Sequence, residues 1–213
     1  MTGAIASSER SLGKVVAIVD YGVGNLGSLQ GAIARVGLRA VVSSQREAIA
    51  AADAIVLPGV GSAALAMDAI RKRDLAPVIA ERFHAQTVPI VGICLGMQLM
   101  HDWSEEGDTA CLGLLPGRTV SFPGGDCLVG WNIVSGAVEG HHDAPKVDRA
   151  YYFNHSFRVE AEATSIMGMA RYGNLPVAAM VRAKRFTGVQ FHPEKSQLVG
   201  QALLSELLGA GSC

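Results

Sequence analysis

The sequence has little charge, no long apolar segment and no secretory signal, and each shortage excludes a class of protein. Charged residues make up 17% of the 213 residues and the formal net charge is −1, so no overall field favours nucleic acid or an anionic membrane. The longest apolar run, at 88–100, is interrupted by a proline, two glycines and a glutamine. It is too short for a transmembrane helix, which needs about 20 apolar residues. The first residues lack the apolar stretch of a signal peptide.

The cysteines are few and widely spaced. They are Cys94, Cys111, Cys127 and Cys213, and no two form a CxxC pair. This spacing fits neither a zinc site nor a disulfide framework, which favours a reducing, cytoplasmic location. The hydrophobic fraction of 49% is enough for a large core without disulfides. We expect a flexible arm at 1–13 and one folded domain at 14–213.

The hydrophobic pattern changes halfway along the chain. In the first half, apolar runs at 15–19, 39–42, 54–57 and 88–93 alternate with helical patterns at 26–36, 63–73, 75–84 and after residue 94. In the second half, short strand candidates lie at 119–122, 131–134, 151–153, 157–160, 177–181 and 187–190, before a helix at 196–208. We expect an α/β fold with a mostly parallel open sheet flanked by helices. Additional antiparallel strands are expected in its C-terminal half.

The segment 92–96, Gly-Ile-Cys-Leu-Gly, follows an apolar strand and opens a helix. This is the layout of a nucleophile elbow with cysteine in place of serine. The turn brings the Cys94 sulfur to the carboxyl end of the sheet, where open α/β folds bind ligands. The amino end of the helix favours a thiolate and helps to hold an oxyanion, for which the Leu95 amide is one candidate donor. A buried structural cysteine is the alternative interpretation.

A candidate base lies near the C-terminus, in the segment 190–194, Gln-Phe-His-Pro-Glu. Pro193 favours an extended His192, and in an extended segment His192 and Glu194 point the same way. Glu194 is then expected to orient the imidazole and to complete a triad with Cys94. The alternative is a surface histidine beside a solvated carboxylate.

Glycines on both sides of Val60 follow the third predicted strand. Gly59 and Gly61 leave backbone amides free to face a substrate, so this loop offers a second oxyanion donor. An ordinary strand-to-helix turn explains the same residues, and taken alone the pattern favours that turn.

Two further features suggest other functions. The segment 22–27 matches GxGxxG between a strand and a helix, and Glu47 lies about 20 residues further on, where a ribose-binding acid is expected. The second predicted strand ends without an acid, however, and Asn25 is more simply a helix cap. The cluster 141–143, His-His-Asp, favours a solvated loop because adjacent residues rarely converge on one ion. No metal site is expected.

Taken together, these segments resemble the class I glutamine amidotransferases, and more narrowly the glutaminase subunits of imidazole glycerol phosphate synthases. The matching stretches are 20–28, 57–61, 92–99, 113–117, 130–132, 152–156 and 190–196. The resemblance spans residues 14 to about 208 and implies the flavodoxin-like fold of that family. Cys-Leu-Gly with His-Pro-Glu marks the superfamily. The histidine-biosynthesis branch is marked by Tyr-Gly-x-Gly-Asn-Leu at 21–26, Pro-Gly-Val-Gly at 58–61 and Gly-Met-Gln at 96–98.

The resemblance implies a mechanism. Cys94 attacks the side-chain amide of glutamine, and His192 protonates the leaving ammonia. Water then hydrolyses the glutamyl thioester, with His192 as base and Glu194 holding it. Leu95 and the loop formed by Gly59, Val60 and Gly61 form the oxyanion hole. The residues implied to bind the substrate are Gln98, Glu106, His155, Ser156 and Phe157. No cofactor is implied.

The resemblance also implies a partner. Family members form a heterodimer with a (β/α)8-barrel cyclase subunit, which uses the ammonia to make imidazole glycerol phosphate. The residues implied at that interface are Asn25, Trp131, Asn132 and Lys195. The chain departs from the family at 62–64 and 127–129, and in its N-terminal arm. The alternatives are therefore a paralogous amidotransferase that serves another synthase, a free-standing γ-glutamyl hydrolase, or a nucleotide-binding module without catalysis.

Overall fold

The computed structural model describes residues 13–22, 24–136 and 148–210. Its main sheet is formed by β1 (Val15–Val19), β2 (Arg39–Ser43), β3 (Ala54–Leu57), β4 (Ile90–Ile93), β8 (Leu128–Gly136), β9 (Arg149–His155), β11 (Ile166–Tyr172), β12 (Leu175–Ala183) and β13 (Phe186–Val189). Within the described residues the strand order is β2-β1-β3-β4-β13-β12-β11-β8-β9. The first five strands in this order pair in parallel, and the other pairs are antiparallel. The predicted mostly parallel sheet with added antiparallel strands is confirmed.

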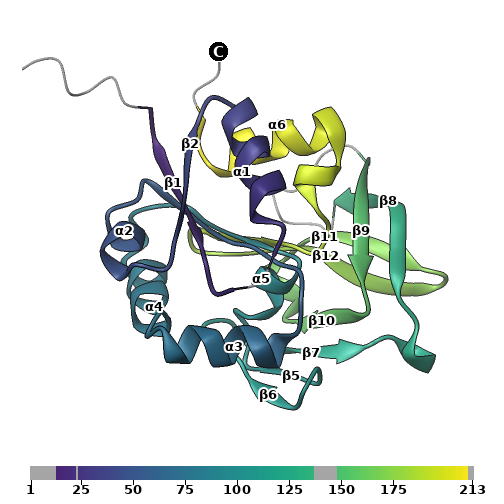
Figure 1. The fold of residues 1–213 in the computed structure, drawn as a ribbon. Helices are drawn as coiled ribbons and strands as arrows, with labels where there is room; N and C mark the ends of the chain where they lie inside the picture. Colours follow the sequence, from purple (N-terminus) through teal and green to yellow (C-terminus); the bar gives the residue numbers. More distant parts are fainter. Residues whose placement is uncertain (1–12, 23, 137–147, 211–213) are drawn as a thin grey trace, which may run out of the picture.

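Helices cover both faces of the parallel part of the sheet (Figure 1). They are α1 (Leu26–Arg35), α2 (Arg46–Ala50), α3 (Ala63–Lys72), α4 (Ala76–Ala85), α5 (Leu95–Gln98) and α6 (Gln197–Leu207). Buried residues of α1 and α6, such as Ile33 and Leu204, pack in one core cluster with alternate strand residues. Buried residues of α2, α3 and α4, such as Ile49, Met67 and Ile79, pack in the other. Strands with both faces covered explain the continuous apolar runs in the sequence.

A smaller sheet lies beside the main one and carries part of the site. Its strands are β5 (Trp103–Ser104), β6 (Thr109–Ala110), β7 (Gly117–Ser121) and β10 (Phe157–Ala161), in the order β10-β7-β5-β6. Single turns of 3-10 helix are η1 (Pro123–Gly125), η2 (Ala163–Ser165) and η3 (Pro193–Lys195). Glu106 lies in the turn between β5 and β6, so this sheet holds a predicted substrate residue.

Some elements were not predicted. The strand β11 lacks a clear alternation because it contains a register irregularity around Gly168, where an added Cβ would lie 2.9 Å from Val134 Cγ1. The two-residue strands β5 and β6 and the five-residue helix α2 are too short to give a periodic signal. Residues 1–12 and 211–213 lie outside the described residues, so the arm at 1–13 and the domain limits at 14–213 stay predictions.

The packing of Gly96 in α5 gives a first testable prediction. An added Cβ there would lie 2.0 Å from the Leu57 carbonyl oxygen, so Gly96→Ala should lower the free energy of unfolding by about 1–3 kcal/mol. The matched control is Gly31→Ala in α1, where the nearest atom is 3.5 Å away. That change should raise the free energy of unfolding by up to about 1 kcal/mol. Urea unfolding of both variants measures this, and equal shifts in the same direction would contradict the packing argument.

Candidate active site

Cys94 lies on a sharp turn between β4 and α5. Its backbone angles are φ 49° and ψ −106°, a region that residues with a side chain rarely adopt. The Cys94 N–H donates to the Val189 carbonyl at 2.7 Å, which fixes the turn against β13. An added Cβ on Gly92 would lie 2.7 Å from the Gly96 oxygen, and one on Gly96 would lie 2.0 Å from the Leu57 oxygen. The residues two positions before and two positions after the cysteine must therefore be glycine. The predicted strand-turn-helix layout is present.

His192 is held on three sides. Its Nδ1 pairs with the Glu194 Oε1 at 2.8 Å. Its N–H donates to the Tyr152 carbonyl at 2.8 Å, and its carbonyl accepts from the Ser196 hydroxyl at 2.7 Å. The expectation of an extended segment is half right. His192 is extended, but Pro193–Lys195 forms a turn of 3-10 helix, which brings the carboxylate back to the ring.

The imidazole of His192 is buried beside the Cys94 sulfur and the Glu194 carboxylate. Burial alone would lower the pKa of His192, but the Cys94 sulfur and the Glu194 carboxylate outweigh burial and raise it from 6.5 to about 9. The His192 Nε2 has no hydrogen-bond partner in the described part of the chain. A cationic imidazolium that interacts with a sulfur favours the thiolate, which is the nucleophilic form.

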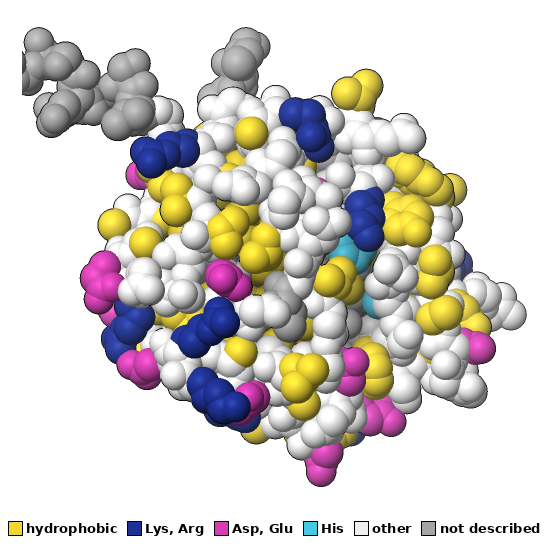
Figure 2. Space-filling view, in the orientation of Figure 1, with side chains coloured by type: hydrophobic (Ala, Val, Ile, Leu, Met, Phe, Trp, Pro, Cys, Tyr) yellow, Lys and Arg dark blue, Asp and Glu magenta, His cyan; other side chains and the backbone are white. Residues whose placement is uncertain are grey.

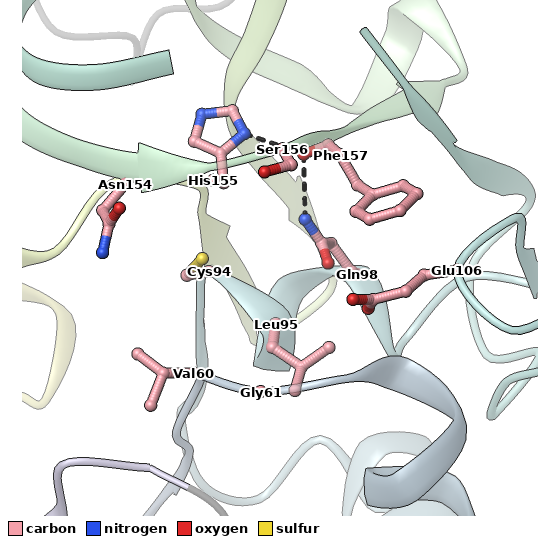
Figure 3. Close-up of a pocket in the computed structure, with 10 residues that line it drawn as sticks. All are labelled: Val60, Gly61, Cys94, Leu95, Gln98, Glu106, Asn154, His155, Ser156 and Phe157. Atoms are coloured by element: carbon pink, nitrogen blue, oxygen red, sulfur yellow. Dashed lines mark hydrogen bonds between the residues drawn. The ribbon is translucent and has the colours of Figure 1, made fainter. Parts of the chain in front are cut away.

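A cavity of about 240 Å³ opens beside the sulfur (Figure 3). Its lining residues are Val60, Gly61, Cys94, Leu95, Gln98, Glu106, Asn154, His155, Ser156 and Phe157. They come from the loop after β3, from the Cys94 turn and α5, from the turn after β5, and from the end of β9 and the start of β10. The structure therefore brings the predicted nucleophile, oxyanion and substrate residues to one place. Gly59 lies directly behind it, since an added Cβ would lie 2.4 Å from the Leu95 nitrogen.

His155 contributes a neutral ring to this cavity. Burial lowers its pKa to about 4, and its Nδ1 pairs with the Phe157 carbonyl at 2.7 Å. The nitrogen that pairs with a carbonyl must carry the proton. The His155 Nε2 is then an acceptor, and it has no partner among the described residues. The ring can therefore accept a hydrogen bond from a bound molecule.

The loop after β3 is tied at both ends. Tyr21, which is fully buried, donates its hydroxyl to the Pro58 carbonyl, and burial raises the pKa of Tyr21 so that it remains a donor. The Glu106 Oε2 accepts from the Ala63 N–H at 2.7 Å, at the start of α3. The Val60 loop is thus linked to the glycine-rich turn after β1 and to a carboxylate that lines the cavity.

Three functional positions were missed from the sequence. Gln190 has no exposed surface, and its Nε2 donates to the Cys94 sulfur at 3.5 Å. Asn154 lines the cavity, and Ser196 supports the His192 backbone. The one available signal was a polar residue directly after an apolar strand, which is where Gln190 stands.

The predicted interface residues do not all lie on one surface. On β8, Val129, Trp131 and Ile133 alternate on the exposed face and are 57%, 50% and 55% exposed. Asn132 is on the opposite face, where its Nδ2 donates to the Arg171 carbonyl at 2.6 Å. Adjacent residues of a strand point to opposite faces, so Asn132 and Trp131 do not share one face of β8. That both contact a partner stays a prediction.

Asn25 and Lys195 have clear local roles. The Asn25 side chain accepts from the Ser28 N–H at 3.3 Å and caps α1, as predicted. The Lys195 Nζ lies 5.8 Å from the Tyr152 ring centre, and the Trp131 ring meets the same tyrosine edge to face at 6.2 Å.

Histidine atoms (cyan) are visible in a hollow bordered by hydrophobic side chains (Figure 2).

The other candidate features receive no support. The cluster 141–143 and Cys213 lie outside the described residues, as does Val23 of the GxGxxG segment. In the ranges that are described, no group of three His, Cys, Asp or Glu side chains is arranged to hold a metal ion. None of the helices in those ranges has the length and apolar character needed to span a membrane.

Comparison with known proteins points to one family. The family model described as glutamine amidotransferase class-I matches residues 17–207. The "Imidazole glycerol phosphate synthase subunit HisH" of Idiomarina loihiensis is 38% identical over 204 residues, which cover 93% of this chain and 99% of that protein. The protein of the same name from Lacticaseibacillus casei is 40% identical over 197 residues, covering 90% and 94%.

Solved structures show the same fold. One described as "glutamine amidotransferase" has a TM-score of 0.71 at 18% identity and covers 91% of this chain and 98% of that chain. The structure of PurLQS from Thermotoga maritima has a TM-score of 0.70 at 17% identity, covering 92% and 98%. At these identities the likeness concerns the fold alone.

The His192–Glu194 pair predicts a pH-dependent effect on stability. Because the folded pKa of His192 lies above the unfolded value, the contacts of the charged ring with Cys94 and Glu194 stabilise the fold fully below pH 6.5, and this stabilisation is lost as the pH rises through about 9. Glu194→Gln should therefore lower the free energy of unfolding by about 2 kcal/mol at pH 6 and by much less above pH 9. NMR titration of Glu194→Gln should show a lower pKa for the His192 ring than in the wild type.

The matched control for this change is Glu162→Gln, at an exposed carboxylate. It should have little effect at either pH. A loss of stability in Glu194→Gln that is the same at both pH values would contradict the assignment.

Proposed function

The chain belongs to the class I glutamine amidotransferase family, and we propose that it is the glutamine-hydrolysing subunit of an imidazole glycerol phosphate synthase. The observation that carries this proposal is the Cys94 turn, whose cysteine lines the cavity, together with the bonded His192–Glu194 pair next to the Cys94 sulfur. Relatives named as subunits of that synthase, 38% and 40% identical over nearly the whole chain, support the choice of pathway.

The proposed reaction has two halves. In the first, the Cys94 sulfur attacks the side-chain carbonyl carbon of glutamine, and His192 gives a proton to the nitrogen as the carbon–nitrogen bond breaks and ammonia leaves. In the second, His192 takes a proton from water, which attacks the thioester carbon and releases glutamate and the sulfur. Glu194 holds the ring and balances its charge in both halves.

The negative oxygen of the tetrahedral intermediates needs donors. The Leu95 N–H is the first of α5 and has no partner within that helix, so it is the first proposed donor. The loop formed by Gly59, Val60 and Gly61 would give the second. Glycines let this loop approach the turn, since an added Cβ on Gly59 would lie 2.0 Å from the Ile93 oxygen.

The remaining polar groups of the cavity suit the backbone end of glutamine. Glu106 offers a carboxylate to the ammonium group. Gln98 donates its nitrogen to Phe157 and Gln190, which leaves its oxygen free to accept. His155, the last residue of β9, and Ser156 line the cavity on the β9 side.

A cyclase partner would dock on the exposed face of β8. Three apolar side chains in one row, those of Val129, Trp131 and Ile133, favour a partner that covers them. Tyr152 connects this face to the site, because Trp131 packs on its ring and its carbonyl holds the His192 N–H. The partner proposed is the (β/α)8-barrel cyclase, to which the ammonia passes.

The same apolar row argues against a free-standing γ-glutamyl hydrolase, which needs no partner. A paralogous enzyme that serves another synthase differs only in the partner, and the departure at 127–129 includes Val129 of that row. The cytoplasmic location stays a prediction.

A glutaminase assay tests this proposal. Purified protein should release glutamate from glutamine slowly when alone, because in this proposal the loop at Val60 must rearrange before its amide can donate. An oxyanion hole that lacks one donor loses about 10²–10³ in rate. Addition of a histidine-pathway cyclase subunit and its nucleotide should raise the rate by about that factor. Cys94→Ala should have no activity in either case.

Interface variants separate the partner from the chemistry. Trp131→Ala should weaken the stimulation, and Leu65→Ala, at an exposed leucine of α3, should not. Activity that depends on Cys94 but never responds to the cyclase would favour another synthase. Full activity in Cys94→Ala would overturn the proposed chemistry.

A further inference from the structure

Gln190 is a buried glutamine whose side-chain amide joins two groups of the active site. Its Nε2 donates to the Cys94 sulfur at 3.5 Å, and its Oε1 accepts from the Gln98 Nε2 at 3.2 Å. Gln190 has no exposed surface, and Gln98 is 4% exposed. Water therefore does not replace either bond when it breaks, and each is costly to lose.

The sheet places Gln190 beside the sulfur. The last registered pair between β13 and β4 is Val189 with Ile93, and the next residues are Gln190 and Cys94. The Gln190 N–H donates to the Ala179 carbonyl at 2.9 Å, which fixes the backbone without help from the side chain. The contact with the sulfur is thus a consequence of strand register.

The neighbours also decide which end of the amide meets the sulfur. The Gln98 Nε2 donates both to the Phe157 carbonyl, at 3.1 Å, and to Gln190. A nitrogen of this kind pairs only with acceptors, so the oxygen of Gln190 must face Gln98 and the nitrogen must face Cys94. The reversed amide would place an oxygen against the sulfur and oppose a thiolate.

We propose that Gln190 is a positioning residue for Cys94, which holds the sulfur by a hydrogen bond and favours the thiolate that attacks the substrate. The inference rests on the proposed function for the identity of that substrate, but the bond acts on the sulfur itself. Hydrogen bonds to an ionised partner are stronger than those to a neutral one. The bond therefore strengthens as the thiol loses its proton.

Alkylation of Cys94 by iodoacetamide tests this without glutamine or a partner. In Gln190→Met, which keeps the length of the side chain but removes the donor, the Cys94 peptide should be alkylated about 10- to 100-fold more slowly at pH 7. At a pH high enough to ionise the thiol in both proteins, the two rates should converge. A merely structural role would slow alkylation equally at every pH.

Two controls make the result decisive. The exposed Cys127 is an internal reference whose alkylation should be the same in every variant. Thr187→Val removes another polar group from β13 and should leave the Cys94 rate unchanged. If Gln190→Met does not fold, Gln190→Glu retains the size and an acceptor for Gln98, and it should slow alkylation at pH 7 at least as much.

Equal Cys94 alkylation in the wild type and in either folded variant would overturn the proposal. Alkylation does not depend on glutamine hydrolysis. If the wild type hydrolysed no glutamine but Gln190→Met still slowed the alkylation of Cys94, the role of Gln190 would be supported and only the proposed function would be contradicted.

Discussion

The backbone turn at Cys94 is the constraint on which the rest of the site depends. A left-handed conformation at a residue with a side chain costs about 1–3 kcal/mol and persists only where its surroundings enforce it. Here the surroundings are glycines whose missing Cβ atoms would overlap backbone, Gly59, Gly92 and Gly96. Because these residues have no Cβ atoms, the ends of β3, β4 and β13 can lie close together. The sulfur, the loop after β3 and the residues after β13 are then neighbours.

The second organising feature is a buried imidazole whose charge is balanced. Burial opposes the charged form of His192, and Glu194 and Cys94 restore it. Tyr152 and Ser196 hold the histidine backbone, so the base is fixed by the edge of the sheet and by its own carboxylate. The same Tyr152 packs against Trp131 on the exposed face. A protein that covers this face would therefore be linked to His192 through one residue, Tyr152.

Much of this arrangement could be predicted from the sequence, and the reasons for the failures are specific. Continuous apolar strands and a Gly-x-Cys-x-Gly turn have strong local signals, so the parallel sheet and the position of Cys94 were predicted correctly. Gln190 was missed because its role comes from strand register, which brings together residues 96 positions apart. The interface motif at 130–132 indicated a partner surface but not which side chains share a face, because neighbouring strand residues point to opposite faces.

The central claim is that Cys94 is the nucleophile toward glutamine, and affinity labelling tests it most directly. A chloroketone analogue of glutamine should modify the Cys94 peptide in one equivalent, and added glutamine should slow that modification in proportion to its occupancy of the site. Labelling of Cys111 or Cys127 in preference to Cys94, or labelling of Cys94 that glutamine does not slow, would contradict the account.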